Sequence, residues 1–447
     1  MMAKSADIVE LECAGLDDMG RGVCRTPGCT YFIEGLLPGE RCQARITHRR
    51  KGLGFGEVRE LLKTSEDRLK PTCQGYPYCA CSLTHLSYQR RLEYKQETIR
   101  NLIEKFGGLD IPVLPTIPCP ELTGYRNKVQ KPVGGHRGHL LLGFYKPFSH
   151  QLVPCTTCES ESPLSGKVLK ALLPILNEAG YDPYDENTGR GQLRHILVRT
   201  SRALDQALVT IVSADPQIEN LGLVAKRLAE KVPEVKGFIL NINTARTNVI
   251  LGVKEKLIWG VPKIQEKVLG KTFNISSKSF FQTNPVLLDT LYQTAIDCAM
   301  LTGSERVLDA YCGTGTIGLS MADRCRNVTG VESETSSYED AKENARINGI
   351  KNAFFRNADC TQFLMNTRAK FEVILLDPPR KGTTPQFISA VNRIAPKRVV
   401  YVSCDPSTLA RDLKLFSENY ALESVQGVDM FPGTHHVETV ASLVRRN

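Results

Sequence analysis

The stretch VLDAYCGTGTIGLSMA, residues 307–322, limits what this chain can fold into more than any other part of the sequence. It starts with apolar residues typical of a buried strand, passes through a glycine-rich turn and continues as a helix. Its glycines, Gly313, Gly315 and Gly318, have the spacing of loops that bind nucleotide-like cofactors. Strand and helix patterns alternate from there to the C-terminus, which predicts an α/β, Rossmann-like domain over residues 263–447.

An acidic residue closes the next predicted strand of this domain. Glu332 ends the stretch NVTGVE, about twenty residues after the first glycine, where an acid accepts hydrogen bonds from a ribose. Nicotinamide dehydrogenases and S-adenosylmethionine (SAM) methyltransferases share this pattern. A further strand, FEVILLDPPRKG (371–382), has Asp377 and two prolines at its carboxyl end, where open α/β sheets bind ligands. Beside Glu332, this strand end favours a SAM methyltransferase acting on a planar base.

A lone cysteine ends a third strand of the same domain, in RVVYVSCDPSTLARDL (398–413). A cysteine in a strand is usually a small buried apolar side chain. Cys404, however, falls at the carboxyl end of its strand, the edge where the cofactor is expected. It is therefore a candidate nucleophile.

Net charge suggests the kind of partner. The 447 residues suffice for two or three domains, and their formal net charge is +9. Two segments without acidic residues, 125–146 and 189–204, contain five and four Lys or Arg residues, respectively. Such stripes suit a polyanion such as RNA, although a solvated basic face gives the same pattern.

The cysteines and the apolar runs suggest the compartment. Fifteen cysteines, an odd number spread along a long chain, do not resemble a disulfide framework. The N-terminus lacks the apolar core of a secretory signal, and no apolar run approaches membrane length. We therefore expect a cytoplasmic protein without a membrane association.

Two further domains are predicted before the α/β domain. Residues 1–66 contain short alternating apolar stretches separated by glycine turns, which predicts a small antiparallel, OB-like β-barrel; its cationic run RITHRRK (45–51) suggests RNA binding. Residues 67–262 are predicted to form a central β-rich domain. It starts with an irregular loop and a helix over 86–108, which can pack on the catalytic domain. Its predicted strands are HLLLGFY, HILVRTS, QALVTIV, GFILNIN and NVILGV.

A group of cysteines lies in the irregular part of the central domain. Cys73, Cys79 and Cys81 are close in sequence, and Cys158 lies further along the chain. Several thiolates on irregular loops of a cytoplasmic protein indicate a metal site, either zinc or a four-iron cluster.

Several motifs together resemble the bacterial RNA uracil-5-methyltransferases, in particular the TRAM-domain, iron-sulfur class that methylates 23S rRNA. The motifs are YRNKVQKPV, GFYKPFSH, GQLRHILVR, TNVILG, KSFFQTN, LDAYCGTGTIG, GVE, LLDPPRKG, VYVSCDPSTLARDL and HHVETVASL. The resemblance covers nearly the whole chain. It implies a TRAM barrel at the N-terminus, SAM as the methyl donor and RNA, with 23S rRNA favoured, as the partner.

The resemblance also implies roles for single residues. Cys404 would add to carbon 6 of uracil, and Glu438 would then remove the hydrogen from carbon 5. The implied SAM contacts are Gln282, Tyr311, Glu332 and Asp377. The implied RNA contacts are Phe281 against a flipped base, Arg380 at the uracil or a phosphate, and Arg126 and Lys128 on the backbone.

The cysteine group departs from the family pattern. The family binds a [4Fe-4S] cluster through three cysteines separated by gaps of five and two residues and a fourth far downstream. Here the gaps are five and one, so Cys79 and Cys81 reach one cluster only if the chain bends sharply at Ala80. Cys155 is a spare thiol nearby. A [4Fe-4S] cluster at Cys73, Cys79, Cys81 and Cys158 is expected, with zinc or an empty site as alternatives.

Other functions stay open at this point. The alternatives are a uracil-5-methyltransferase that acts on tRNA, a cytosine-5-methyltransferase, and a non-catalytic iron-sulfur RNA-binding protein. A nicotinamide enzyme is a fourth alternative. Cytosine enzymes often carry their nucleophile in a Pro-Cys pair, whereas here the motif is SCDP. Nothing in the sequence indicates a protein partner or identifies the modified uridine.

Overall fold

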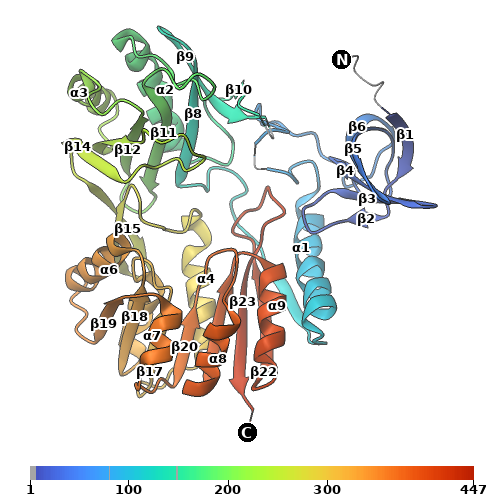
Figure 1. The fold of residues 1–447 in the computed structure, drawn as a ribbon, viewed down its shortest axis with the longest axis vertical. Coiled ribbons are helices and arrows are strands. Elements are labelled where there is room, and N and C mark those ends of the chain that lie inside the picture. Colours follow the sequence, from blue (N-terminus) through green and yellow to red (C-terminus); the bar gives the residue numbers. More distant parts are fainter. Residues whose placement is uncertain (1–6, 80, 147–148, 447) are drawn as a thin grey trace.

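The structure, a computed structural model, describes residues 7–79, 81–146 and 149–446 and contains four β-sheets (Figure 1). Ala80, at which a sharp bend was expected, lies outside the described residues, as do the first six residues of the predicted barrel. Figure 1 shows the N-terminal sheet and the central sheet on opposite sides above the large C-terminal sheet.

The N-terminal sheet is strongly curved. Its order is β1-β5-β6-β4-β3-β2, and β1 and β2, at its two ends, are separated by only two residues of chain. Its pairs are antiparallel except β4 with β6, which are parallel. Alternate residues such as Cys42, Ala44 and Ile46 of β5 fill its interior. The strands are β1 (Asp7–Glu12), β2 (Gly15–Leu16), β3 (Gly22–Thr26), β4 (Cys29–Glu34), β5 (Arg41–Arg50) and β6 (Leu53–Lys63).

The segment after the N-terminal sheet joins the C-terminal sheet. Residues 64–87, where described, form turns and isolated bridges, followed by α1 (Tyr88–Leu102), which continues as η1 (Ile103–Gly107) and stops at Gly108 with a φ of 65°. Ile99 and Ile103 pack in the core of the C-terminal sheet, and β7 (Val113–Ile117) pairs in parallel with β22 of that sheet. Residues 88–117 therefore belong structurally with the C-terminal sheet, although the predicted boundary places them in the central domain.

The central sheet has the order β10-β9-β8-β11-β12-β13-β14, and α2 and α3 contact each other and cover one face. Its pairs are antiparallel except β12 with β13. The elements are β8 (Lys128–His136), β9 (His139–Tyr145), β10 (Leu152–Pro154), α2 (Pro163–Ala179), β11 (Leu193–Ser201), β12 (Gln206–Ser213), α3 (Leu221–Lys231), β13 (Val235–Ile242) and β14 (Lys254–Gly260).

One predicted strand of this domain is wrong. NVILGV (248–253) forms bends, and the edge strand β14 begins only at Lys254. The side-chain amide of Asn243 donates to the carbonyls of Val249 and Ile250, and that of Asn241 donates to Gly252. Side chains thus replace the neighbouring strand as partners for these carbonyls, so the apolar run needs no ladder.

The C-terminal sheet has the order β19-β18-β17-β20-β21-β23-β22-β7. The first five strands are parallel, and β23 runs antiparallel between β21 and β22. The chain leaves β17 towards β18 and β19 and returns as β20 on the other side of β17. The carboxyl ends of β17 and β20 therefore form a topological switch point, the usual place for a ligand in an open α/β sheet.

The remaining elements complete this domain. A hairpin of β15 (Lys263–Val268) and β16 (Lys271–Ser276) links it to the central sheet, β15 contacting β12 and β16 contacting α6. The others are α4 (Pro285–Cys298), β17 (Arg306–Ala310), α5 (Thr316–Met321), η2 (Ala322–Arg324), β18 (Asn327–Glu332), α6 (Thr335–Ile347), β19 (Ala353–Asn357), α7 (Cys360–Asn366), β20 (Val373–Leu376), α8 (Pro385–Ile394), β21 (Arg398–Ser403), α9 (Pro406–Phe416), β22 (Tyr420–Val428) and β23 (Glu438–Arg445).

Local sequence explains where several of these helices begin. In α2, α4, α8 and α9 a Ser, Asn, Thr or Asp side chain accepts a backbone N–H of the first turn, and proline follows it at the first helical position. Such a cap satisfies an otherwise unpaired donor, and proline lacks the N–H that would be unpaired there. Within the described residues, no helix combines the length and the apolar character needed to cross a membrane.

Candidate active site

Two carboxylates fix the glycine-rich loop at the end of β17. Asp309 is buried, and its Oδ2 accepts a hydrogen bond from the N–H of Gly318 at 2.9 Å. A side chain on Gly318 would lie 2.5 Å from that oxygen, so only glycine fits. Oε2 of Glu332 accepts from the N–H of Gly313 at 2.9 Å. Glu332 therefore lies beside the loop, as the fingerprint spacing predicts.

A small hollow opens at the switch point between β17 and β20. Aromatic side chains and two carboxyl groups line it together with the glycine loop. Burial raises the pKa of Asp377 to about 7 and that of Asp309 to about 8. The lining residues are Phe280, Phe281, Tyr292, Asp309, Tyr311, Cys312, Gly313, Thr314, Thr316, Ile317 and Asp377.

The antiparallel pairing of β21 with β23 brings the candidate nucleophile and base together. Ser403 pairs with Thr439, so Cys404 and Glu438 follow at the same end of adjacent strands. Glu438 is 2% exposed, and within the described parts of the chain its Oε2 has no hydrogen-bond partner. Burial, together with the charge of Asp377, raises the pKa of Glu438 to about 8. A buried carboxyl group with an unused oxygen can exchange a proton with a bound molecule.

Cys404 is half-buried and shares this electrostatic environment. Burial, followed by the charges of Glu438 and Asp377, raises the pKa of the Cys404 thiol to about 12. The positive charge of Arg380 lowers the pKa of both Cys404 and Glu438. Arg380 thus favours the ionised forms of the two groups that would react.

His436 contacts the guanidinium of Arg380. Its Nε2 lies 3.4 Å from an Arg380 nitrogen, and burial lowers the pKa of His436 to about 3. The neutral ring can therefore accept a hydrogen bond from Arg380. Neither His436 nor Asp309 was singled out from the sequence. An acid inside the apolar strand VLDA could have indicated Asp309, because buried acids need a reason, whereas nothing marked His436.

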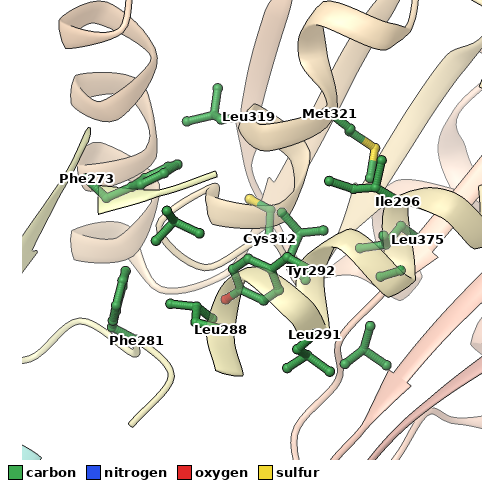
Figure 2. Packing of buried hydrophobic residues seen from close by; sticks show 14 of the residues in the cluster. Phe273, Phe281, Leu288, Leu291, Tyr292, Ile296, Cys312, Leu319, Met321 and Leu375 are labelled. Carbon is green, nitrogen blue, oxygen red and sulfur yellow. The ribbon is translucent and has the colours of Figure 1, made fainter. Parts of the chain in front are cut away.

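Two adjacent phenylalanines, Phe280 and Phe281, lie at the hollow but differ in exposure. Phe281, predicted to face the base, is 3% exposed and packs in the core with Leu288 and Phe273 (Figure 2). Phe280, its neighbour, is 65% exposed and lies at the hollow. The order of two adjacent aromatic residues does not reveal which one faces the core. Both rings line the hollow, and Phe280 is the more exposed of the two.

Gln282 and Tyr311 approach the site in different ways. Tyr311 lines the hollow with a φ of 63° and packs against Phe387. Gln282 is 3% exposed and does not line the hollow, but its carbonyl accepts from the side-chain amide of Asn127 at 3.2 Å. Gln282 thus lies in the segment that joins the central sheet to the hollow.

Arg126 and Lys128 lie at the same junction and are both half-buried. The charge of Arg126 contributes to the lowered pKa of His436, which places Arg126 near the site. Burial, together with Arg199 and Arg126, lowers the pKa of Lys128 to about 7. Several other cations of the basic stripes have intramolecular roles: Lys131 pairs with Glu161, Arg194 with Glu186 and Arg202 with Glu121, and Arg199 donates to the carbonyls of Ser277 and Ser279. The stripes are therefore only partly available to RNA.

The four predicted cysteine ligands are all buried in one cluster, together with Cys155. The sulfurs of Cys73, Cys79 and Cys158 lie within 4.8 Å of one another, and Cys73 and Cys158 are 3.5 Å apart. Hydrogen bonds from Cys79 and Cys81 lower the pKa of Cys158. A thiolate among neighbouring thiols fits a metal site. The Cys155 sulfur instead donates to the carbonyl of Thr157 at 3.2 Å.

Comparisons with known proteins agree with this geometry. The model of the tRNA (Uracil-5-)-methyltransferase family matches residues 87–446. An uncharacterized RNA methyltransferase of Halalkalibacterium halodurans is 38% identical over 99% of this chain and 98% of its own length, and one of Oceanobacillus iheyensis is 39% identical over 98% and 96%.

A solved structure also matches nearly the whole chain. The Pyrococcus abyssi tRNA (uracil-54, C5)-methyltransferase in complex with S-adenosyl-L-homocysteine has a TM-score of 0.79 and 25% identity, covering 97% of this chain and 99% of that one. The family match and the relatives extend over the sheet that carries the hollow, the thiol and the buried carboxyl. The chain is therefore a SAM-dependent RNA methyltransferase and belongs to the tRNA (uracil-5-)-methyltransferase family.

Proposed function

We propose that this enzyme methylates carbon 5 of a specific uridine through a covalent bond between Cys404 and carbon 6 of the base. One observation carries the proposal. The pairing of β21 with β23 sets a half-buried thiol beside a buried carboxyl group whose Oε2 has no hydrogen-bond partner among the described residues, and the charge of Asp377, which lines the hollow, acts on both groups. Carbon 5 of uracil is a weak nucleophile, and a thiolate added at carbon 6 activates it.

The reaction divides into three steps. The Cys404 thiolate adds to carbon 6, and the electron pair of the double bond moves to form an enolate. Carbon 5 then takes the methyl group from the sulfonium of SAM, leaving S-adenosylhomocysteine. Glu438 finally removes the proton from carbon 5, the double bond re-forms, and the sulfur leaves carbon 6 as a thiolate. Because burial raises its pKa, the Glu438 carboxylate is a stronger base than an exposed one.

Five residues are proposed to serve SAM. The hollow suits a cationic methyl donor, because two buried carboxyl groups with raised pKa values would be stabilised as carboxylates beside a positive charge. Glu332 would accept from the ribose, and Tyr311 would contact the donor at the wall of the hollow. The proposed SAM residues are Gln282, Tyr311, Glu332, Asp377 and Asp309.

On the RNA side, we assign Phe280 to stacking against the flipped base and Arg380 to the uracil or an adjacent phosphate. Arg126 and Lys128 are assigned to the RNA backbone. The curved N-terminal sheet supports an RNA-binding, TRAM-like role, since Arg50 and Lys51 are exposed at the turn between β5 and β6. Charged loops on such small barrels suit a phosphate backbone.

The proposed target is 23S rRNA, and the proposed metal is a [4Fe-4S] cluster held by Cys73, Cys79, Cys81 and Cys158. Resemblance to the iron-sulfur class supports both. A tRNA uridine is the second candidate, because the solved structure that matches nearly the whole chain is named a tRNA methyltransferase. Mass spectrometry of rRNA and tRNA from cells lacking the protein distinguishes the two by showing which RNA has lost a methyl group.

The test of the mechanism is a trapped intermediate. In Glu438→Gln, attack and methyl transfer proceed but release stalls, so a protein–RNA adduct carrying the new methyl group accumulates on denaturing electrophoresis. Loss of a positioned base costs about a hundredfold to ten-thousandfold in rate. Cys404→Ala and the double variant form no adduct, since the base acts only after the thiol. Near-normal turnover of Glu438→Gln, or activity in Cys404→Ala, contradicts the assignment.

A further inference from the structure

The loop before Glu438 is held by several distant parts of the chain. We call residues 429–436 the base loop, because it leads into Glu438. From α1, Lys95 forms a fully buried ion pair with Asp429 and donates to the carbonyl of Phe431 at 2.9 Å. Arg91, also in α1, donates to the carbonyl of Pro432 at 2.6 Å. The first half of the base loop, residues 429–432, is therefore anchored to α1.

The second half of the base loop, residues 433–436, is anchored to the cysteine segment, which we define as residues 73–84 without residue 80. The N–H of Leu83 donates to the carbonyl of Gly433 at 3.0 Å. A side chain on Gly433 would lie 3.2 Å from Thr84 and 3.5 Å from the sulfur of Cys81. Figure 1 shows the loop between β22 and β23 reaching up towards the chain that joins the barrel to α1. The base loop thus packs directly on the cysteine group.

Ser82 makes the side-chain connection between the two segments. The backbone N–H of His435 donates to the Ser82 hydroxyl oxygen at 3.3 Å, which leaves the hydroxyl hydrogen free to donate to Nδ1 of His435 at 3.1 Å. Ser82 directly follows Cys81, and His435 lies three residues before Glu438. The Ser82–His435 contact therefore connects the cysteine cluster to the loop that leads to Glu438.

We propose that Ser82 is a positioning residue for Glu438, because it ties the base loop to the cysteine segment. The structural order of the cysteine group then sets the rate at which the RNA is released from the adduct. The proposal rests on the proposed function. Metal held by the four cysteines would fix the segment that carries Ser82. Cys404 lies in the short turn between β21 and α9, whereas the Ser82 hydrogen bonds go to His435 in the base loop, so adduct formation should depend less on this connection than adduct breakdown.

The test uses the full-length protein, purified anaerobically, and follows the preformed RNA adduct rather than turnover alone. Ser82→Ala should slow adduct breakdown at least about tenfold, because small misplacements of a catalytic group have large effects on rate. Its metal content should equal that of the parent, and hydrogen exchange at residues 433–438 should accelerate. Ser82→Thr, which keeps the hydroxyl, should restore breakdown, and Ser65→Ala, a serine change in the preceding linker, should have no effect.

A second arm tests the link to the cysteine group. Oxidation and chelation of the parent protein should slow adduct breakdown, and the same treatment should add little to Ser82→Ala. Parent-like breakdown in Ser82→Ala overturns the inference, and unchanged breakdown after metal removal overturns its link to the cysteine group. If Glu438→Gln traps RNA while Ser82→Ala does not, only this inference fails. If Glu438→Gln traps nothing, the proposed function fails instead.

Discussion

At the scale of single residues, the protonation of Glu438 governs the last step of the proposed reaction. Burial raises its pKa to about 8, so below that pH the carboxyl group is mostly protonated and cannot accept the proton from carbon 5. Raising the pH ionises it and activates the base. Breakdown of preformed adduct should therefore accelerate about tenfold per pH unit below about pH 8 and level off above it.

A pH jump after adduct formation measures this step alone. Because the thiol has already added to the base before the jump, its ionisation does not affect the measured rate of breakdown. This separation is needed because burial also raises the pKa of Cys404 to about 12 and makes the addition step depend on pH. Glu438→Gln should show no such dependence. If the rate of adduct breakdown in the parent protein does not change with pH, Glu438 is not the base.

Arg126 should contribute one phosphate contact. Arg126→Ala should weaken RNA binding, leave the affinity for SAM unchanged and lower the slope of log affinity against log salt by about one. Titrations of labelled RNA at several salt concentrations measure the slope. Arg137→Ala, an exposed change in the same basic stripe, is the matched control and should alter the slope less. If the slope is unchanged in Arg126→Ala, Arg126 does not contact a phosphate and is instead a structural residue of the junction.

At the scale of elements, α9 holds the loop that carries Arg380. The fully buried Asp412 of α9 accepts from the N–H of Thr383 at 2.8 Å and from the hydroxyl of Tyr401 at 2.7 Å. Asp412→Asn exchanges a charged acceptor for an amide in this buried network. It should lower the free energy of unfolding by about 2 kcal/mol or more and reduce methyl transfer.

Urea unfolding, monitored by circular dichroism, measures this loss, and activity at saturating SAM and RNA measures the second effect. The control is Asp359→Asn, at the exposed start of α7, where asparagine caps a helix as well as aspartate does. An Asp412→Asn protein as stable as that control would show that the network does not hold the loop.

At the scale of the whole molecule, the cysteine group joins segments that are far apart in sequence. Anaerobically purified protein should be brown and contain about four irons per chain, as a cubane held by cysteines would give. Cys79→Ala should lose the iron. Cys24→Ala, which removes a buried thiol of the N-terminal sheet, and Cys155→Ala should retain it. A colourless protein that contains one zinc ion would show that the cysteines bind zinc instead of a cluster. The methyltransferase assignment would be unaffected.

Local signals in the sequence determined much of the catalytic domain. The glycine loop, the strand ends at Asp377 and Cys404 and the caps followed by proline all depend on neighbouring residues, because turns, caps and buried strands follow local rules. The same rules failed at NVILGV, where Asn241 and Asn243 supply side-chain partners from a different strand.

Only the tertiary structure decided how these parts meet. The antiparallel insertion of β23 beside β21 puts Glu438 next to Cys404, although 33 residues lie between them in the sequence, because register between strands is a long-range property. Packing likewise turns Phe281 into the core and leaves Phe280 exposed, and it joins β7 to the C-terminal sheet. The sequence by itself determined the chemical groups and the local turns that present them. Long-range packing decided which groups share one environment, and therefore their pKa values and their access to a ligand.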